Sequence, residues 1–589
     1  MRTEIRLLLA VGLMILVMVG TNLLFPPAQP EPGIQGADSV TAPQVEQPAG
    51  SLPEIGPAPA TEVEGAGAPA EEAAVQAVAR QEVVVESPLY RYTFDNYGAA
   101  ATSVQLLEFE SLVADGGEPV ELVPEGTRAL QGRVVVGRDT LDLSRLGFTV
   151  DPAEGLSLRA GDGPRTLTFR YSNGGAFGVE VAYTFRPDDY VVDVSTRVSG
   201  VERPLLFTSL GEGLALNEAD SDQEARELAY VGNHLNEGID DTRLDQVEER
   251  ILQEGPFRWV AFRSRYFVSV ILPGLGEEEA LYLGGLIATP SPAEFQAGVS
   301  VAHPLAVDGV THYRVFMGPQ VYATLQSLGE ELEEVNPYGW AIFRPILRPI
   351  VAAILWVLNF LHDTLSIGYG WVLILFGVLM RVVLWPLNQK AMRSQMKNMA
   401  VQPLMKEIQT KYKDNPEKLQ KEMMKLYKEH GFNPLGGCLP MLIPFPVLIA
   451  LFFVFRNTIE LRGVPFLWLP DLAAKDPLYI LPLALAVSMF LLQWISLRSM
   501  PESNPQMRMM MWFMPVFMGF IFLQFPSGLN LYYATANVAT LPQQVLIARE
   551  RKKVKILKPK ADPGSQEASG SPSGPSEKRS GKRKGRKKR

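Results

Sequence analysis

The distribution of hydrophobic and polar positions divides the chain into two parts with different periods. From about residue 82 to 325, short runs alternate apolar and polar residues and are broken by turn residues. The clearest case is an alternating run at 179–185 and another at 192–198, with Pro187-Asp188-Asp189 between them. Period-two alternation around a Pro-Asp turn predicts a β-hairpin with one buried face. Many such pairs predict a large antiparallel sandwich over 81–335. Helices that pack at its margins are predicted at 223–254 and 320–334.

Beyond Pro337 the apolar runs become long enough to cross a hydrocarbon core of roughly 30 Å. Another such run lies in 1–25, after a charged start. It lacks the small residues of a cleavage site, which favours an uncleaved signal anchor over a cleaved signal peptide. The segment 338–364 carries two arginines one turn apart and two prolines, so we expect an interfacial amphipathic helix there. The remaining spans are predicted at 368–387, 438–455, 478–496, 509–525 and 529–547, which with the anchor makes six.

Two segments lack any apolar pattern. Residues 26–80 consist mainly of Pro, Ala, Gly and Glu, and cannot bury enough apolar surface to offset chain entropy, so a disordered linker is predicted. The tail 549–589 is strongly basic and is also predicted to be disordered. It will attract anions, and anionic lipid, ribosomal RNA and a simple topology signal all stay open as its role.

The charge distribution predicts the orientation in the membrane. The formal net charge of −9 hides a segregation, because acids crowd the first half whereas Lys and Arg crowd the loop 388–435 and the tail. Cytoplasmic loops carry the excess of Lys and Arg. Both basic regions therefore belong in the cytoplasm, and six crossings place the N-terminus and the C-terminus there too. The sandwich is then periplasmic, and the protein is expected in the inner membrane.

The pattern of apolar and charged residues in the loop 388–435 predicts two amphipathic helices that form a cytoplasmic hairpin. Asn415-Pro416-Glu417 provides an N-cap, a proline at the first helical position and an acid in the first turn. A solvated connector and a docking site for a partner both remain open. A second reversal is predicted at Phe525-Pro526-Ser527-Gly528, where Pro presets one turn dihedral and Gly accepts a positive φ. The last two spans should therefore form an antiparallel pair.

Arg381 is the main candidate for function, since it lies inside the second predicted span. An arginine facing lipid costs a few kcal/mol, so it usually faces a protein interior or a water-filled cavity. The competing interpretation is snorkelling, because the cytoplasmic end of the helix is only about six residues away. Polar residues in other spans favour a wet interior, although hydrogen bonding between helices is their routine role. These residues are Gln493, Gln524, Asn530, Asn537, Gln543 and Gln544.

Other patterns mainly exclude functions. No Asp or Glu within these spans offers a proton relay, which counts against a coupled pump. No nucleotide-binding, hydrolase or metal-spaced motif is present, so we expect a non-enzyme without cofactor or metal. The single cysteine, Cys438, cannot form an intramolecular disulfide. Methionines cluster in the fifth span, where core filling is favoured over an adaptable surface.

Four stretches, taken in order, resemble the YidC/Oxa family of membrane protein insertases. They are Arg381-Val-Val-Leu-Trp-Pro386-Leu, Asn433-Pro-Leu-Gly436-Gly437-Cys438-Leu-Pro440, Asp476-Pro-Leu-Tyr-Ile-Leu-Pro482 and Phe525-Pro526-Ser-Gly528-Leu-Asn-Leu-Tyr532-Tyr533. The resemblance covers about 340–550, and Trp259-Val-Ala with Tyr266-Phe267 is similar to the periplasmic domain of the Gram-negative branch. The implied fold is a multi-domain membrane protein with a six-helix bundle, an all-β periplasmic sandwich and a cytoplasmic hairpin. The insertase core is assigned to 365–548.

The resemblance implies a hydrophilic groove that is open to cytoplasm and lipid and that receives the polar end of a substrate. Groove or path residues would be Arg381, Gly377, Gln493, Asn530, Tyr532 and Tyr533, although some family members have a hydroxyl residue at the position of Gly377. The apolar flank of the substrate would slide past Leu448, Met514 and Met518. Motif residues with a structural role would be Pro386, Gly436, Gly437, Pro526 and Gly528.

The implied partners are nascent integral membrane proteins, the Sec translocon, the phospholipid membrane, and a ribosome or signal recognition particle receptor at the hairpin and tail. A monomer is expected. Two alternatives stay open at this point. A transporter or channel would show paired intramembrane acids or an inverted repeat, and neither is found in the sequence. An envelope-assembly protein with a glycan-binding sandwich would show ligand-bound aromatic clusters in that domain.

Overall fold

The computed structural model describes residues 78–113, 117–274, 282–304, 309–336, 338–339, 343–413, 415–429, 445–498 and 505–551. The predicted signal anchor 1–25, nearly all of the linker and the tail beyond Arg551 lie outside the described residues. The same holds for Gly436, Gly437 and Cys438. The chain forms two compact units. The first unit holds the described residues of 1–376, 446–486 and 505–534, and the second those of 377–445, 487–504 and 535–589.

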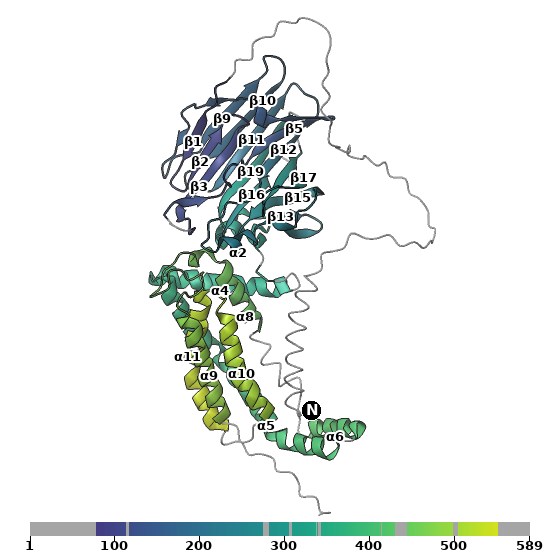
Figure 1. Cartoon of the computed structure of the whole chain (residues 1–589), viewed down its shortest axis with the longest axis vertical. Helices are drawn as coiled ribbons and strands as arrows, with labels where there is room; N and C mark the ends of the chain where they lie inside the picture. The colour runs from purple at the N-terminus through teal and green to yellow at the C-terminus, as the bar shows by residue number, and fades with distance from the viewer. Residues whose placement is uncertain are drawn as a thin grey trace, which may run out of the picture. The chain divides into compact units, whose positions relative to one another are not determined.

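The β-domain of the first unit consists of two sheets (Figure 1). The smaller sheet has the order β4 (Pro119–Glu121), β3 (Ala100–Glu110), β2 (Tyr90–Asp95), β1 (Glu82–Glu86) and β8 (Leu156–Ser157). The larger sheet runs β6 (Asp139–Asp142), β5 (Gln131–Val136), β12 (Leu205–Gly211), β18 (Ala297–His303), β17 (Leu283–Pro290), β15 (Ile251–Arg263), β16 (Phe267–Pro273), β19 (Val310–Pro319), β11 (Val191–Ser199), β10 (Gly178–Phe185), β9 (Arg165–Ser172) and β7 (Thr149–Asp151). β13 (Ala229–His234) pairs with β15 and with β14 (Gly238–Arg243). All pairs are antiparallel except β1 with β8, so the predicted sandwich is confirmed apart from that pair.

The predicted hairpin at 179–198 is confirmed by strand register. β10 and β11 pair antiparallel, with Val179 opposite Val198 and Tyr183 opposite Val194. Every second residue of β10 is buried, which is the pattern expected of a strand with one face in a core. Aromatic rings fill the space between the sheets: the ring of Phe94 on β2 lies 4.8 Å from Tyr183 and 5.7 Å from Phe169 on β9. Face-to-face packing of the two sheets follows from these contacts.

The helix predicted at 223–254 is wrong. Only Ser221–Ala225 (α2) and the short turn Leu244–Gln246 (η2) are helical, and the rest forms β13, β14 and the start of β15. β14 is an edge strand whose residues are exposed or half-buried, so it lacks the apolar face that would have identified it. The helix predicted at 320–334 is confirmed as α3 (Tyr322–Leu328) and η3 (Leu332–Glu334).

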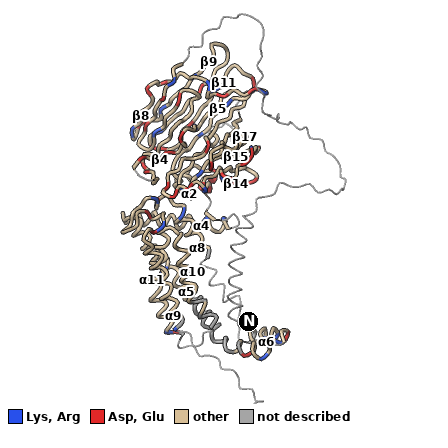
Figure 2. The backbone as a smooth tube through the Cα atoms, in the orientation of Figure 1, with Lys and Arg blue, Asp and Glu red and all other residues tan. Residues whose placement is uncertain are grey.

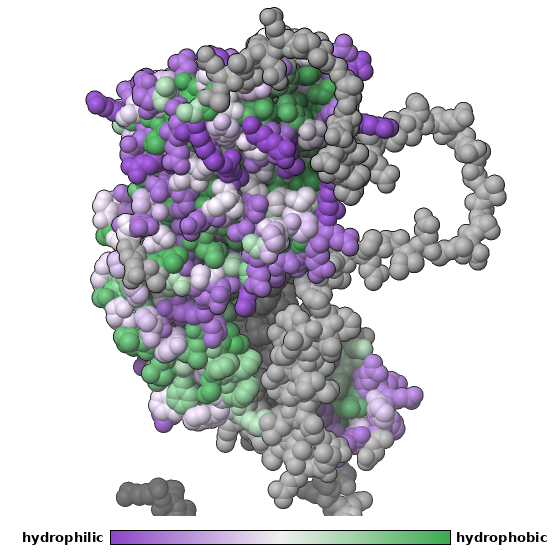
Figure 3. Space-filling model, turned by 45° about the horizontal axis from the view of Figure 1, so that its top comes forward, coloured by the Kyte–Doolittle hydropathy of each residue, from purple (hydrophilic) through white to green (hydrophobic). Residues whose placement is uncertain are grey.

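The helical part contains α4 (Arg344–Leu365), α5 (Tyr369–Lys411), α6 (Pro416–Glu429), α8 (Phe445–Asn457), α9 (Ile480–Arg498), α10 (Pro505–Phe522) and α11 (Ser527–Arg551). Charged residues are frequent on the β-domain and sparse along α8 to α11 (Figure 2). Hydrophobic residues gather over the helical part in the space-filling view (Figure 3). Such apolar surface is expected of helices that lie in lipid.

Two helices among the described residues are long and apolar enough to cross a membrane, by length and composition alone. They are Arg344–Leu365 and the segment Tyr369–Pro386 of α5. Shorter apolar helices are Pro446–Asn457, Ile480–Ser496 and Trp512–Phe522. The six crossings therefore remain a prediction. α4 begins six residues later than the predicted segment 338–364 and ends one residue beyond it, and Pro349 does not interrupt it. Its interfacial position stays a prediction as well.

The helical hairpin that the sequence predicts for the cytoplasmic side differs from its prediction in the first helix. α5 runs without a break from Tyr369 to Lys411, so the helix expected after the second span is the continuation of that span. The second helix matches the prediction. Oδ1 of Asn415 accepts the N–H of Lys418 at 3.1 Å, and Pro416 occupies the first helical position of α6.

The turn before α11 also forms for a different reason than predicted. Gly528 lies inside α11 with an ordinary helical backbone and not in a positive-φ turn. A Cβ at this position would lie 3.1 Å from Cδ1 of Leu373 and 3.1 Å from the carbonyl oxygen of Leu472. Gly528 is therefore required for close packing, and Leu523 to Pro526 make the reversal. The ring of Phe522 lies 5.4 Å from that of Tyr533, as an antiparallel pair of helices requires.

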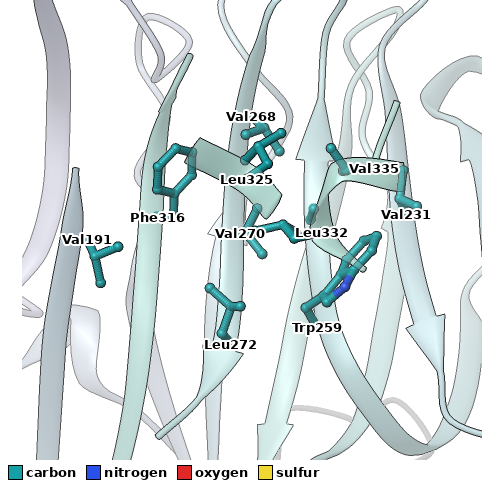
Figure 4. Packing of buried hydrophobic residues seen from close by; sticks show 11 residues of the cluster. Val191, Val231, Trp259, Val268, Val270, Leu272, Phe316, Leu325, Leu332 and Val335 are labelled. Atoms are coloured by element: carbon teal, nitrogen blue, oxygen red, sulfur yellow. The ribbon is translucent and has the colours of Figure 1, made fainter. Parts of the chain in front are cut away.

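A buried hydrophobic cluster fixes α3 and η3 on the larger sheet (Figure 4). Trp259 of β15 is fully buried in it, and its indole N–H donates to the carbonyl oxygen of Glu330 at 2.9 Å. Leu325 and Leu332 cover the sheet from the helical side. Burial of apolar surface stabilises a fold by about 25 cal/mol per Å², so this cluster holds α3 and η3 against the sheet. The chain thus leaves the β-domain in a fixed position before α4 begins.

Candidate functional site

An aromatic cluster surrounds the predicted substrate-path tyrosines in the first unit. The ring of Tyr532 on α11 lies 5.6 Å from Phe376 of α5 and 5.7 Å from Phe455 of α8. It also lies 5.1 Å from Tyr533. Tyr532 is buried, whereas Tyr533 is half-buried. Tyr533 therefore offers the more accessible ring, and Tyr532 holds three helices together.

Asn530 has a structural role that the sequence did not reveal. Its side-chain N–H donates to the carbonyl oxygens of Phe522, at 3.0 Å, and Phe525, at 3.5 Å. These bonds tie Asn530 to the last residue of α10 and to the turn that follows it. Its own Oδ1 is buried without a hydrogen-bond partner among the described residues. Asn530 thus stabilises the α10–α11 turn through its N–H groups, while its Oδ1 accepts no hydrogen bond from the described residues.

The second unit holds Arg381, Gly377 and Gln493. Arg381 and Gln493 are half-buried, on α5 and α9, and Gly377 is buried one turn before Arg381. The predicted site residues therefore divide between the two units, with Asn530, Tyr532 and Tyr533 in the first.

Two polar residues of α11 bind neighbouring helices in the second unit. The amide of Asn537 donates to Oγ of Ser488 on α9 at 3.1 Å, and that of Gln543 donates to the carbonyl oxygen of Trp385 on α5 at 3.3 Å. Both are hydrogen bonds between helices, which is the routine role that the sequence left open.

The predicted apolar slide residues lie on exposed helix faces. Leu448 on α8 is 42% exposed and Met514 on α10 is 37% exposed, while Met518 is half-buried. Their exposure shows that these side chains are not packed into the protein interior. For Met514 this decides against core filling, the interpretation favoured from sequence. Pro386 is exposed within α5, and Pro526 is buried at the turn.

A charged junction joins the β-domain to the end of α8 and the loop after it, and no local pattern in the sequence predicted it. Arg456 of α8 contacts Glu227 at 2.5 Å, and Arg265 contacts the same carboxylate at 3.2 Å. Arg462 is 4% exposed, and its Nε lies 2.6 Å from Glu218. Its other nitrogens donate to the carbonyl oxygens of Glu110 and Asn217. The guanidinium also lies over the ring of Phe267 at 5.1 Å.

The loop after α8 also forms hydrogen bonds with the α10–α11 turn. The N–H of Ser527 donates to the carbonyl oxygen of Ala474 at 2.7 Å, and that of Gly528 to Leu472 at 2.8 Å. Oγ of Ser527 donates to the carbonyl oxygen of Asp471 at 2.8 Å. One loop, residues 458–479, thus binds both the β-domain and the start of α11. We call it the connecting loop.

A buried carboxylate next to the junction makes stability depend on pH. Burial, and then the charge of Glu218, raise the pKa of Glu224 from 4.5 to about 7. The folded chain therefore binds more protons than the unfolded chain between these values, and stability falls as pH rises through that window. Since one pKa unit corresponds to 1.36 kcal/mol, the full effect is at most about 3 kcal/mol.

We expect Glu224→Gln to gain stability relative to the wild type as pH rises from 5 to 8. The measurement is the thermal midpoint of both proteins at the two pH values. Glu249→Gln, at an exposed position, serves as the control and should track the wild type at both. A difference between Glu224→Gln and wild type that is the same at pH 5 and pH 8 would contradict the assignment.

No metal-binding group was found in the described part of the chain: no three His, Cys, Asp or Glu side chains are grouped so as to hold an ion.

Comparison with known proteins gives matches over both parts of the chain. A family described as "YidC periplasmic domain" matches residues 82–353, and one described as "60Kd inner membrane protein" matches residues 360–555. The membrane protein insertase YidC of Chlorobaculum tepidum is 32% identical over 523 residues, covering 81% of this chain and 86% of that protein. The protein of the same name from Syntrophus aciditrophicus is 30% identical over 478 residues, covering 80% and 85%.

A solved structure described as "Active YidC insertase crystal structure with the first transmembrane domain resolved" is 20% identical, covering 79% of this chain and 92% of that one. Its TM-score of 0.32 is too low to support a conclusion about the present chain. The family relationship therefore rests on the sequence matches alone.

Proposed function

Because the chain belongs to the YidC family of membrane protein insertases, we propose that it inserts and folds membrane proteins through a hydrophilic groove open to cytoplasm and lipid. The chain is an inner membrane protein and a membrane protein insertase. One observation carries this conclusion: relatives of that name match about four fifths of the chain. The family is not an enzyme family, and it decides against the transporter and envelope-assembly alternatives.

In the proposed groove, Arg381 receives the polar end of the substrate. Two facts support this role. The segment Tyr369–Pro386 is apolar and long enough to cross a membrane, and a charge within such a helix is costly unless a polar environment compensates it. We assign the groove and path to Arg381, Gly377, Gln493, Asn530, Tyr532 and Tyr533. The apolar flank of the substrate passes Leu448, Met514 and Met518.

The orientation and partners belong to the same proposal. Both termini are proposed to be cytoplasmic and the β-domain periplasmic, because the basic residues concentrate in 388–435 and in the tail. The insertase acts as a monomer, alone or beside the Sec translocon. The hairpin of α5 and α6 and the basic tail are its contacts for a ribosome or the signal recognition particle receptor.

Insertion in a purified system tests the proposed function. Proteoliposomes that contain only this protein should insert a short single-span substrate without nucleotide, scored as protection of the substrate from added protease. Empty liposomes provide the background, and protein-containing liposomes are expected to exceed it several-fold. Protection that appears only when Sec components are added would overturn autonomous insertion and leave an assistant to Sec.

A further inference from the structure

The connecting loop exposes large apolar side chains at two places. Leu467 is 72% exposed, and its neighbour Trp468 is exposed as well. Leu478 and Tyr479 are exposed at the second place. The described part of the β-domain exposes only four large apolar side chains, and these are well separated in sequence: Val84, Val113, Leu216 and Leu252. Scattered apolar residues are ordinary on a protein surface, whereas clustered ones mark a surface that binds something.

A tight turn presents the first place. Phe466 and Leu469 are buried, and each donates its N–H to the carbonyl oxygen of the other at 2.9 Å. Leu467 and Trp468 therefore form the tip between them. Leu467 has a φ of 56°, and so has Tyr479 at the second place. This left-handed backbone is uncommon for large side chains, and such positions concentrate at functional sites.

Asp476 connects the two places through its buried carboxylate. The carboxylate accepts the N–H groups of Leu478 at 3.0 Å and Leu481 at 2.7 Å. It also accepts the indole N–H of Trp468 at 3.3 Å. These polar groups are thus bonded inside the loop. Polar groups that lie in or near lipid require such internal partners, because water is scarce there.

Contacts with α5 place the first tip at the start of an apolar helix. The segment Tyr369–Pro386 is long and apolar enough to cross a membrane, and Trp371 is its third residue. The ring of Trp371 is exposed and lies 5.3 Å from that of Phe466. A Cβ on Gly370 would overlap the ring of Phe466, so this approach needs a glycine. Trp is enriched where membrane-spanning helices meet the headgroups, so the first tip lies at the level expected for that interface.

The second tip leads directly into α9. Leu478 and Tyr479 precede Ile480, where the apolar helix Ile480–Ser496 begins. At about 1.5 Å per residue this helix measures roughly 25 Å, which is less than the hydrocarbon core of roughly 30 Å. A short span thins the bilayer around it or draws its flanking residues into the bilayer. Leu478 and Tyr479 supply apolar flanking residues at this end.

We propose that the connecting loop inserts its two apolar tips into the phospholipid bilayer, at the face where α5 and α9 begin. Leu467 and Leu478 contact acyl chains. Trp468 and Tyr479 lie among the headgroups, because their rings combine an apolar body with one polar group. The other side of the loop binds the β-domain through the buried Arg462. Lipid contacts of the loop thus hold the β-domain at the membrane surface, a role that the proposed groove does not include.

Quenching by lipid-borne nitroxides tests this insertion on the full-length protein. Leu467→Cys and Leu478→Cys are introduced singly into a Cys438→Ser background, which holds no other cysteine, and are labelled with the fluorophore NBD. The protein is placed in nanodiscs of phosphatidylcholine and phosphatidylglycerol, with or without a phosphatidylcholine that carries a nitroxide on its acyl chain. Both positions are exposed, so the label displaces no buried side chain.

Leu252→Cys is the matched control, because Leu252 is an exposed leucine of the β-domain, on β15. We expect quenching at positions 467 and 478 to exceed that at position 252 by about threefold or more, since only the tips reach the hydrocarbon core. Equal quenching at all three positions would overturn the proposal, and quenching at one tip alone would overturn it for the other. The nanodiscs contain no other protein, so quenching at the tips identifies lipid and not a partner protein. No substrate is inserted in this measurement, so neither result bears on the proposed function.

Discussion

Arg381→Ala is expected to reduce insertion of a substrate with an acidic translocated end by about tenfold or more. The loss of 1.4 kcal/mol of stabilisation in a step corresponds to tenfold in its equilibrium. Opposite charges a few ångströms apart exceed that value at the intermediate dielectric of a partly wet site. The measurement is protease protection in proteoliposomes, at equal amounts of reconstituted protein. A substrate with a neutral translocated end should lose much less.

Two variants on the same helix sharpen this test. Arg381→Lys keeps the charge and should retain most of the insertion of the acidic substrate. Val382→Ala truncates an adjacent side chain that is 62% exposed, and should behave as the wild type. Full activity of Arg381→Ala with both substrates would return Arg381 to snorkelling, while the insertase itself would stand.

Arg462→Ala should lower the free energy of unfolding of the β-domain by about 3–5 kcal/mol. Removal of one partner of a buried ion pair leaves the other charge buried without compensation, here that of Glu218. The backbone carbonyls of Glu110 and Asn217 also each lose the hydrogen bond that Arg462 donates. The measurement is denaturant unfolding followed by the fluorescence of the protein, in which Trp259 is fully buried.

Hydrogen exchange shows whether the same change reaches α11. We expect faster exchange at the N–H groups of Ser527 and Gly528, because their acceptors lie on the connecting loop. Arg243→Ala is the control, since Arg243 pairs with Asp245 on the exposed surface and such pairs contribute about 1 kcal/mol or less. Equal destabilisation by both variants would show that the buried Arg462–Glu218 pair contributes no more to stability than an exposed ion pair.

The β-sandwich could be predicted because alternation directly records which face of a strand is buried. Tyr183 is 1% exposed and its strand neighbours are half-buried, as their alternation indicated. β14 could not be recognised in this way. It pairs with one neighbour only and buries no full face, so its sequence, GIDDTR, shows no period of two.

Gly528 illustrates a different limit of sequence reasoning. A glycine two residues after a proline, as here, indicates either a positive φ or a close approach of another chain segment. Here the second applies, and the segments that approach, at Leu373 and Leu472, are distant in sequence. Only the tertiary structure could separate the two explanations.

The charged junction shows the same limit for electrostatics. Arg462 and Glu218 are 244 residues apart and form their contact across two parts of the fold. Neither residue lies in a motif. A charged residue just after an apolar helix, such as Arg462 after α8, normally shows only that the helix has ended. By contrast, Arg381 could be selected from sequence alone, because a charge inside an apolar run is costly wherever the fold places it.

The uninterrupted α5 has a mechanical consequence. From Gly377 to Lys411 it is a single helix within the second unit, with Arg381 near one end and the turn to α6 at the other. At about 1.5 Å per residue this stretch measures roughly 50 Å. Two prolines, Pro386 and Pro403, lie between Arg381 and the end of this stretch, and each removes one helical hydrogen bond, so the helix bends most easily at these two places. The number of residues therefore sets the distance along α5 between Arg381 and the turn to α6, while the bends at the two prolines set the angle between the two ends.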